Sequence, residues 1–492
     1  MMKKQYECLQ MGLELRKNLI ELKQQLQNEE SKRELLELLA GDYSLFMELL
    51  QNPEPKVRKN TALILGKLGQ DEHAGILYHA YEREQQLFVK SDYLKALMEL
   101  DCSALQTQLE QRLIQLEQYH PTEEEEKHIR EELLSLRKLA EKNVVHRKHC
   151  FQGYEHTWEV ILTTGKKYQQ ITAEQIEEGR VTILKSGVRV KTSHLRPILR
   201  IPTYRELLLP LNIRKVPADP KEAARALAAS NLLELLYKAH KTEDTFYFRL
   251  GLQGNSSLEQ RGAFIKKCGY ALEQETAGKL KNSPSDYEVE IRLAQNQDGQ
   301  FLPLLKLYTF KENRFSYRKY TVASSIRPQQ AALIVRLARP YMQEDAQILD
   351  PFCGVGTMLI ERERVCPAKV MYGVDIFGEA IAKAKENTKL AGREVYYINR
   401  DFFEFTHKYT FDEIITDMPE RGKKSKSEQD ALYAAFFEKA SEVLAAHGQI
   451  IMYSNEMNFV KKQIRLQKEF TLLREYSMDE KENYYLFIIR KC

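Results

Sequence analysis

The stretch ILDPFCGVGTMLIERERV, residues 348–365, joins an apolar run, a carboxylate, a pair of glycines and a helical pattern. The apolar run leads into Asp350, and Gly354 and Gly356 follow in the turn before the helical segment. Glycine has no Cβ, so a loop with two glycines lets the backbone approach a ligand closely. We therefore predict a strand, a ligand-binding loop and a helix, and these residues alone leave the ligand open.

Strand patterns alternate with helical patterns from residue 346 onward, which predicts right-handed crossovers and a parallel sheet covered on both faces. The last two apolar runs, 470–478 and 483–491, predict an antiparallel hairpin. A parallel sheet that ends in such a hairpin is typical of methyltransferases that use S-adenosylmethionine (SAM), and it is unusual for dehydrogenases. The runs that predict the parallel strands are 346–350, 369–375, 395–401, 411–417 and 448–454.

Four predicted strands end in an acid, namely Asp350, Asp375, Asp401 and Asp417. Ligands of open parallel sheets bind where the strands end. SAM carries an ammonium group, a sulfonium and a ribose diol but no phosphate, so we expect Asp350 near its cationic end and Asp375 on the ribose hydroxyls. Asp401 and Phe402 would receive the adenine. The full predicted cofactor set is Asp350, Phe352, Gly354, Gly356, Asp375, Ile376, Asp401 and Phe402.

A nicotinamide dinucleotide is the alternative ligand for a strand, a glycine loop and a helix. Its fingerprint, G-x-G-x-x-G, requires a third glycine three residues after the second. Here Gly356 is followed by Thr357, Met358 and Leu359, so the third glycine is absent. Asp375 fits either ligand, but acids at four successive strand ends favour SAM.

The length and composition indicate a globular protein of several domains. The chain has 492 residues, with 43% hydrophobic and 29% charged residues, and roughly 150 residues per domain would give three. Its 74 basic and 70 acidic residues leave a net charge of +4, so any nucleic-acid-binding face must be local. The charged start, MMKKQYECLQ, and the lack of an apolar run near ~20 residues predict a cytoplasmic protein without a membrane partner. The seven cysteines are scattered, which predicts reduced thiols.

Residues 1–145 carry a helical pattern throughout. The segments 57–69 and 89–101 share their apolar positions at an offset of 32 residues, and Leu65, for example, recurs as Leu97. Repeated helix pairs bury their apolar faces by stacking on neighbours. This segment resembles a HEAT-type repeat, and a plain helical bundle is the alternative. We expect it to bind a protein partner and to carry no chemistry.

A histidine-rich stretch follows this helical segment. His146, His149, Cys150 and His156 are potential metal ligands, but their spacing fits no tetrahedral site. A solvated linker explains them better, and we predict no metal site.

The middle of the chain mixes strand and helix patterns. A strand is predicted at 157–165, a long amphipathic helix at 221–241 and a strand at 245–253, and two alternating strands are joined by Asn-Gln-Asp-Gly, 296–299. The order of these parts resembles the THUMP-containing portion of RNA-modification enzymes, which holds the acceptor end of tRNA. The whole fold is then a HEAT-like arm at 1–145, an α+β THUMP-like domain at 146–315 and a Rossmann-like α/β domain with a C-terminal hairpin at 316–492.

Three motifs carry a closer resemblance. DPFCGVGTMLIE (350–361), YGVDIFGEAIAKAKEN (372–387) and INRDFFEF (398–405) are similar to the first three motifs of THUMP-domain RNA methyltransferases that modify the exocyclic amine of guanosine. The resemblance implies SAM as the cofactor and a guanosine N2 amine in tRNA, or alternatively in ribosomal RNA, as the methyl acceptor.

The fourth motif departs from the family's pattern. There the family has an acid or amide, a Pro-rich turn and an aromatic that stacks on the flipped base. IITDMPERGKKSKSEQD (414–430) has Asp417 and Pro419 in place but Glu420 where the aromatic is expected. The resemblance implies that Asp417 and the Met418 carbonyl hold the target amine, and we take Asp417 and Pro419 as the catalytic residues.

Two basic stretches are candidates for RNA contacts, RFSYRKY (314–320) and RGKKSK (421–426), although a solvated surface loop explains the second equally well. We expect a monomer. Two other functions stay open: a SAM-dependent methyltransferase acting on protein, another RNA or a small molecule, and a non-catalytic RNA-binding scaffold that retains a SAM pocket. The predicted RNA-binding residues are Arg318, Lys319, Arg421, Lys423 and Lys424.

Overall fold

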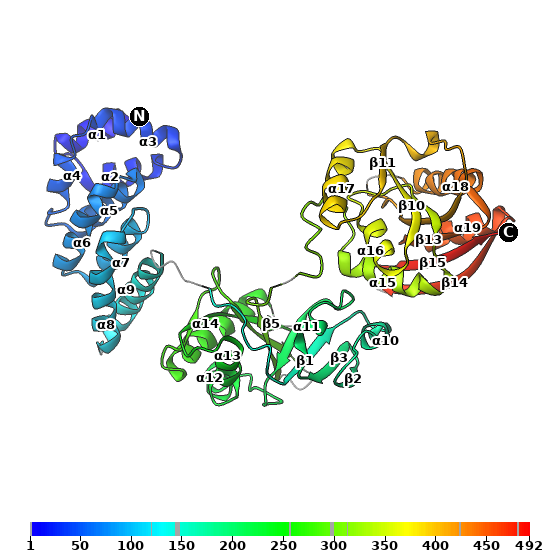
Figure 1. The fold of residues 1–492 in the computed structure, drawn as a ribbon. Coiled ribbons are helices and arrows are strands. Elements are labelled where there is room, and N and C mark those ends of the chain that lie inside the picture. Colours follow the sequence, from blue (N-terminus) through cyan, green and yellow to red (C-terminus); the bar gives the residue numbers. More distant parts are fainter. Residues whose placement is uncertain are drawn as a thin grey trace. The chain divides into compact units, whose positions relative to one another are not determined.

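The computed structural model describes residues 2–119, 121–142, 148–254, 257–295, 300–311, 313–422, 425–479 and 482–492, apart from the side chains of residues 29, 141 and 142. The chain divides into two compact units, Met1–Arg147 and Lys148–Cys492. Figure 1 labels their helices and strands along the chain. Among the described residues, no helix is both long and apolar enough to cross a membrane.

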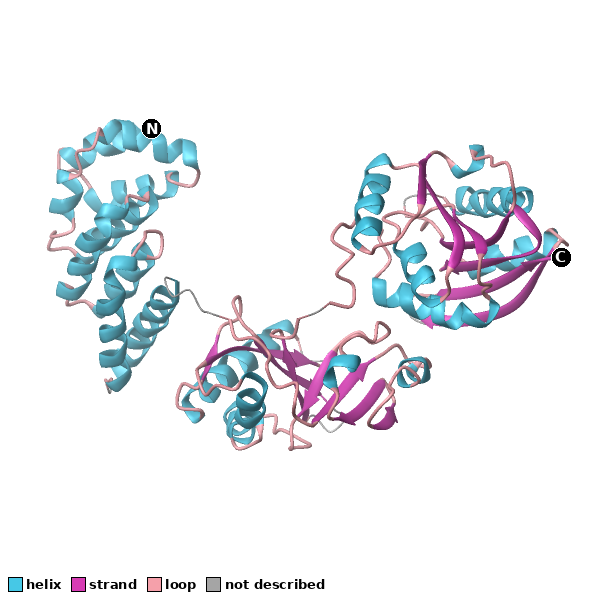
Figure 2. Ribbon diagram, in the orientation of Figure 1, coloured by secondary structure: helices cyan, strands magenta, loops and turns pink. Residues whose placement is uncertain are grey.

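The described part of the first unit contains helices and connecting loops but no strand (Figure 2). Four of its helices pack in succession, α2 on α5, α5 on α7 and α7 on α9, while α1, α6 and α8 each pack on the helix that follows them. The helices are α1 (Met2–Gln10), α2 (Leu15–Gln25), α3 (Glu29–Leu39), α4 (Ser44–Leu49), α5 (Pro55–Leu68), α6 (Ala74–Arg83), α7 (Leu87–Leu97), α8 (Gln106–Gln118) and α9 (Glu123–Lys142).

The two segments that share a sequence pattern form helices α5 and α7, which pack directly against each other. Their matched residues Leu65 and Leu97 are fully buried. A Cβ atom on Gly66 would lie 2.6 Å from the carbonyl oxygen of Ala96, so the two backbones meet where a side chain is missing. The shared pattern therefore marks the packed faces of neighbouring helices.

The second unit contains two sheets. The first has the strand order β2-β3-β1-β4-β8-β7-β5-β6. Strands β7 and β8 pair antiparallel, as predicted, while the turn at 296–299 lies outside the described residues. The strands are β1 (Trp158–Thr163), β2 (Arg180–Leu184), β3 (Gly187–Thr192), β4 (Leu207–Pro210), β5 (Phe246–Gln253), β6 (Leu280–Asn282), β7 (Val289–Gln295) and β8 (Phe301–Leu307).

The single helix predicted at 221–241 is wrong, because two helices stand there, α12 (Pro220–Ala228) and α13 (Leu232–His240). The break has a local cause. The Ser230 hydroxyl donates to the Leu227 carbonyl and accepts from the Leu232 amide, and such side-chain bonds compete with helix hydrogen bonds. The remaining helices of this part are α10 (Gln169–Ala173), α11 (Leu195–Ile198) and α14 (Leu258–Glu275).

The second sheet has the order β11-β10-β9-β12-β13-β15-β14. Its first five strands are parallel, and β15 pairs antiparallel with both β13 and β14, as the predicted hairpin requires. The strands are β9 (Ala346–Asp350), β10 (Ala368–Asp375), β11 (Tyr396–Asn399), β12 (Phe411–Asp417), β13 (Leu444–Ser454), β14 (Phe470–Asp479) and β15 (Tyr484–Lys491).

Helices alternate with the strands of this sheet along the chain. The central strands β9 and β12 are buried, which explains why their sequences are continuous apolar runs. Strand β11 ends at Asn399, so Asp401 lies beyond the strand rather than at its end and caps the short helix Phe402–Glu404. The helices are α15 (Pro328–Ala338), α16 (Thr357–Val365), α17 (Gly378–Leu390), α18 (Lys426–Val443) and α19 (Met457–Leu466).

Candidate methyltransferase site

The loop between β9 and α16 depends on its two glycines. Gly354 and Gly356 have φ angles of +51° and +80°, in the left-handed region that residues other than glycine rarely adopt. A Cβ atom on Gly356 would also overlap the hydroxyl of Tyr397, which comes from β11 and bonds the Thr388 hydroxyl at 2.7 Å. Gly356 is thus required both by its backbone conformation and by the space that Tyr397 takes.

Two of the strand-end acids hold this loop. The buried Asp350 carboxylate accepts a hydrogen bond from the Phe352 amide at 3.1 Å. Asp375 accepts from the amides of Gly354 and Phe377, one on each carboxylate oxygen, both at 2.9 Å. Burial, and then the nearby charges of Asp417 and Asp375, raise the pKa of Asp350 well above its usual range. Asp350 is therefore a buried acid that holds the backbone of the loop through the Phe352 amide.

The predicted adenine side contains several aromatic rings. Asp401 accepts from the Phe403 amide at 3.0 Å. Phe402 is buried, and its ring packs against Phe352 and Phe436, so it belongs to the core. Phe352 and Phe403 are the partly exposed rings of this cluster.

Apolar side chains are also exposed directly after Asp375. Ile376 is 61% exposed and Phe377 is 72% exposed. Large apolar side chains in solvent at a strand end are suited to covering a planar ligand ring. Phe377 was not in the predicted set, although it stands beside Ile376 in the same short segment.

The turn Asp417-Met418-Pro419 is fixed from two sides. The Met418 amide donates to the Tyr453 carbonyl of β13 at 3.0 Å. The Pro419 carbonyl accepts from the side-chain amide of Gln429, a buried residue of α18, at 2.9 Å. Burial, and then the charge of Glu420, raise the pKa of Asp417 to about 7. The carboxylate at this turn can therefore take up or release a proton near neutral pH.

Aromatic rings lie beside this turn, although Glu420 replaces the expected one. Asp417 is the register partner of Tyr453 in the neighbouring strand. The Tyr453 ring stacks on that of Tyr484, with centroids 4.8 Å apart and planes at 14°. The Tyr484 hydroxyl donates to the Glu420 carboxylate. No local pattern could have found Tyr484, which lies at the start of β15, far from Glu420 in sequence.

The predicted RNA-binding residues are spread over different environments. Arg318 is partly buried and donates to the Thr357 hydroxyl at 3.3 Å and the Ile326 carbonyl at 2.7 Å, which places it at the start of α16. Lys319 and Arg421 are exposed. Lys423 and Lys424 lie outside the described residues.

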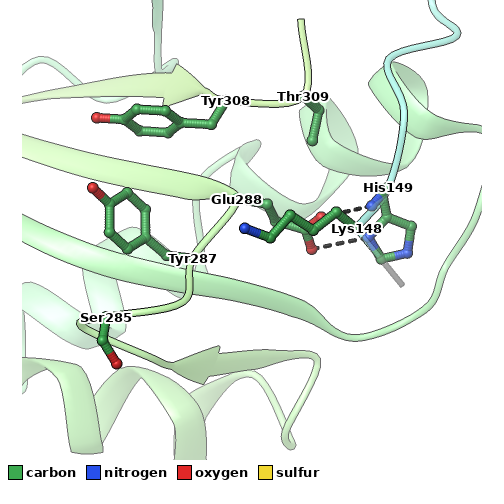
Figure 3. Close-up of a pocket in the computed structure, with 7 residues that line it drawn as sticks. All are labelled: Lys148, His149, Ser285, Tyr287, Glu288, Tyr308 and Thr309. Carbon is green, nitrogen blue, oxygen red and sulfur yellow. Dashed lines mark hydrogen bonds and ion pairs between the residues drawn. The ribbon is translucent and has the colours of Figure 1, made fainter. Parts of the chain in front are cut away.

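In the described part of the histidine-rich stretch, His149 is bound to a carboxylate and is not part of a cluster of metal ligands. His149 contacts the Glu288 carboxylate through its backbone amide and its ring Nδ1, both at 2.9 Å. These two residues line a pocket of about 260 Å³ that also contains Tyr287 and Tyr308 and none of the predicted site residues (Figure 3). Over the described part of the chain, which leaves out His146, no group of three or more acid, His or Cys residues could hold a metal.

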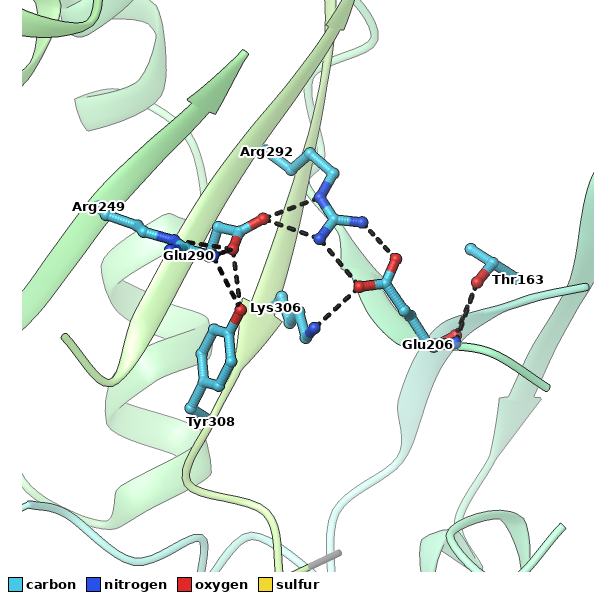
Figure 4. A network of polar contacts seen from close by, with 7 residues as sticks. All are labelled: Thr163, Glu206, Arg249, Glu290, Arg292, Lys306 and Tyr308. Atoms are coloured by element: carbon cyan, nitrogen blue, oxygen red, sulfur yellow. Dashed lines mark hydrogen bonds and ion pairs between the residues drawn. The ribbon is translucent and has the colours of Figure 1, made fainter. Parts of the chain in front are cut away.

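The first sheet carries a network of paired charges (Figure 4). Glu206 accepts from Arg292 and Lys306, and Glu290 accepts from Arg249 and Arg292. Its hydrogen bond with Arg292, more than any other contact, lowers the pKa of Glu206 to about 2. These carboxylates stay ionised and paired, as in a structural network, and offer no proton-transfer group.

Comparisons with known proteins find a family match for the C-terminal part of the chain. Residues 316–480 match the family described as "RMKL-like, methyltransferase domain". A tRNA (guanine(10)-N2)-dimethyltransferase of Methanothermobacter thermautotrophicus is 28% identical over 176 residues, which are 34% of this chain and 49% of that protein. The chain thus spans about half the length of this curated relative.

Solved structures share the fold. TrmN from Thermus thermophilus matches with a TM-score of 0.52 and 19% identity, over 68% of this chain and 100% of that one. A predicted N6-adenine-specific DNA methylase from Listeria monocytogenes matches with a TM-score of 0.50 and 13% identity, over 68% and 97%. In sequence, residues 316–480 are thus similar to a methyltransferase domain, and the glycine loop and every strand of the second sheet except β15 lie within this part of the chain.

Proposed function

We propose that this protein transfers a methyl group from SAM to the exocyclic N2 amine of a guanosine in tRNA. The observation that carries the proposal is the turn Asp417-Met418-Pro419, which β13 and α18 fix at the same sheet edge as the glycine loop. The relative from Methanothermobacter, whose name states this chemistry, supports the choice of acceptor.

The residues of the glycine loop fit SAM. Gly354, with nothing within 4 Å of its Cβ position, leaves the backbone open to the amino-acid end of a ligand. Each carboxylate oxygen of Asp375 already accepts one amide hydrogen bond and has a second lone pair for a ribose hydroxyl. Ile376, Phe377, Phe352 and Phe403 offer apolar surface to the adenine. When bound, SAM supplies the methyl group on its sulfonium sulfur.

Asp417 supplies what a weak nucleophile lacks. The lone pair of an exocyclic amine is delocalised into the base, so alignment and hydrogen bonding of its protons lower the barrier. Asp417 would accept one amine proton in a hydrogen bond while the Met418 carbonyl accepts the other. On accepting the methyl group the amine would become cationic, and the Asp417 carboxylate would take up its proton. A pKa of about 7 suits this carboxylate to taking up the proton at neutral pH.

The other parts of the chain would serve RNA and protein binding. We assign residues 146–315 as a THUMP-like RNA-holding domain, because the match to TrmN covers more of the chain than residues 316–492 alone could supply. We assign residues 1–145 as a HEAT-like arm for a protein partner, because α2, α5, α7 and α9 stack in succession. Lys319 and Arg421 remain exposed for phosphate contacts, and we expect the protein to act as a monomer.

The test is methyl transfer from tritiated SAM to tRNA by the full chain, with mass spectrometry of the labelled nucleosides. We expect N2-methylated guanosine, and we expect Asp417→Ala to lower turnover by about a hundredfold or more with SAM affinity unchanged. Label in protein or in a small molecule would support the second candidate, a methyltransferase of another substrate, which Glu420 in place of an aromatic favours. SAM binding without any transfer would support a scaffold.

A further inference from the structure

Three side chains near Asp417 form a group to which the reaction proposed above assigns no contact with the substrate base. Tyr453 and Tyr484 stack with nearly parallel planes, and Glu420 accepts a hydrogen bond from the Tyr484 hydroxyl. They come from β13, β15 and the turn after β12, so three separate segments meet here. We call Tyr453, Tyr484 and Glu420 the tyrosine stack.

The two rings of the tyrosine stack differ in exposure. Tyr453 is 8% exposed, and Tyr484, which covers it, is partly exposed. One face of the Tyr484 ring is covered by Tyr453, so its exposed part lies on the other side or at the edge. The stack therefore presents one aromatic surface and has a second ring behind it.

Glu420 ties this surface to the catalytic turn. A tyrosine side chain turns about its bonds, and a hydrogen bond from its hydroxyl to a neighbouring carboxylate restricts that motion. Glu420 lies three residues after Asp417, and Asp417 is the register partner of Tyr453 in the neighbouring strand. The aromatic surface is thus held beside the carboxylate that would bind the target amine.

Enzymes that modify a base within a folded nucleic acid take it out of its stack and hold it against aromatic or apolar side chains. We propose that the Tyr484 ring is the stacking surface for the flipped target base, with Glu420 as a positioning residue and Tyr453 as the ring behind it. This inference rests on the proposed function, because it names where the substrate base binds. It also explains why Glu420 stands where the family has an aromatic: Glu420 positions the Tyr484 ring of β15, and that ring takes the aromatic's place.

The experiment measures kcat and KM for tRNA and the Kd for SAM on the full chain at about pH 8, well above the Asp417 pKa. Tyr484→Ala should lower kcat/KM for tRNA at least tenfold and leave the SAM Kd unchanged. Tyr484→Phe keeps the ring and should restore most of the loss. Tyr485→Ala is the matched control, because adjacent strand residues point to opposite faces, and it should leave the tRNA kinetics unchanged.

The positioning role of Glu420 has its own readout. Glu420→Ala and Tyr484→Phe each remove the same hydrogen bond. The kcat/KM of the double variant should therefore be no lower than that of the less active single variant. Glu420→Gln keeps an acceptor oxygen and should retain activity. Additive losses in the double variant would overturn the positioning role of Glu420.

The outcomes separate this inference from the proposed function. A wild-type protein that methylates guanosine in tRNA, together with a Tyr484→Ala variant of equal kcat/KM, would overturn the stacking surface alone. The Tyr484→Ala variant could instead lose SAM affinity and unfold at a lower temperature, with Tyr484→Phe failing to restore the tRNA kinetics. That result would make Tyr484 a structural residue and overturn the inference as well. A wild-type protein without RNA methylation would overturn both proposals.

Discussion

The carboxylates of Asp417 and Glu420 lie three residues apart in the sequence at the end of β12, and the Glu420 charge affects how Asp417 titrates. Burial disfavours the charged form of Asp417, and the Glu420 charge adds to this effect. Proton uptake at the turn should therefore depend on pH. Asp375 has a different role, because its contacts with two backbone amides hold the glycine loop in shape.

Activity should follow the ionisation of Asp417. Only the carboxylate form accepts a proton from the amine, so kcat/KM should fall as the pH drops through about 7. Glu420→Gln removes the negative charge that helps to raise this pKa, and the acid limb should then move to lower pH. A pH profile of methyl transfer to tRNA checks both statements, and an unchanged acid limb in Glu420→Gln would contradict the coupling.

At the scale of the element, the glycine loop depends on β11 as well as on its own residues. Gly356→Ala places a side chain in the left-handed region and against the Tyr397 hydroxyl, whereas Gly354→Ala has the same backbone strain and open space around its Cβ. We expect Gly356→Ala to weaken SAM binding by about a further tenfold or more beyond Gly354→Ala, since only the first forces a neighbouring ring to move. Calorimetric titration of both variants with SAM measures the difference, and equal losses would show that backbone strain alone decides.

Helix packing in the first unit allows a similar comparison. Gly66→Ala puts a Cβ 2.6 Å from the Ala96 carbonyl oxygen and should separate α5 from α7, with a loss of about 1–3 kcal/mol. Gly75 lies in α6 with nothing within 4 Å of its Cβ position, so Gly75→Ala should be neutral or stabilise by up to about 1 kcal/mol. Hydrogen exchange in α5 and α7 reports the effect, and equal protection in both variants would contradict the close packing.

At the scale of the whole molecule, the chain divides into two units, of which the first is the proposed arm and the second contains the proposed RNA and SAM sites. A chain that begins at Lys148 keeps His149, whose backbone and ring hold Glu288, and it should fold. It should bind tRNA within about threefold of the full chain, with the same dependence on salt, because the proposed phosphate contacts lie outside the arm. Binding measured at several salt concentrations checks this, and a loss above tenfold would make the arm the RNA-binding part.

Local patterns predicted much of the second sheet and of the glycine loop. Strand ends at Asp350, Asp375 and Asp417 follow from apolar runs that stop at a polar residue, and the left-handed glycines follow from Gly354 and Gly356. The helix predicted at 221–241 failed because hydroxyl contacts of Ser230 break it, and apolar periodicity does not register such bonds.

The sequence by itself determined the alternation of strands and helices, the acids at the strand ends and the departure at Glu420, because each depends on neighbours within a few residues. Only the tertiary structure decided that Tyr397 fills the space beside Gly356, that Gln429 holds Pro419 and that Tyr484 reaches Glu420. Such contacts join segments that are distant in the chain, and they form only when the strands have assembled in their final order. Strand order follows from packing of the whole domain, and no short stretch of sequence encodes it.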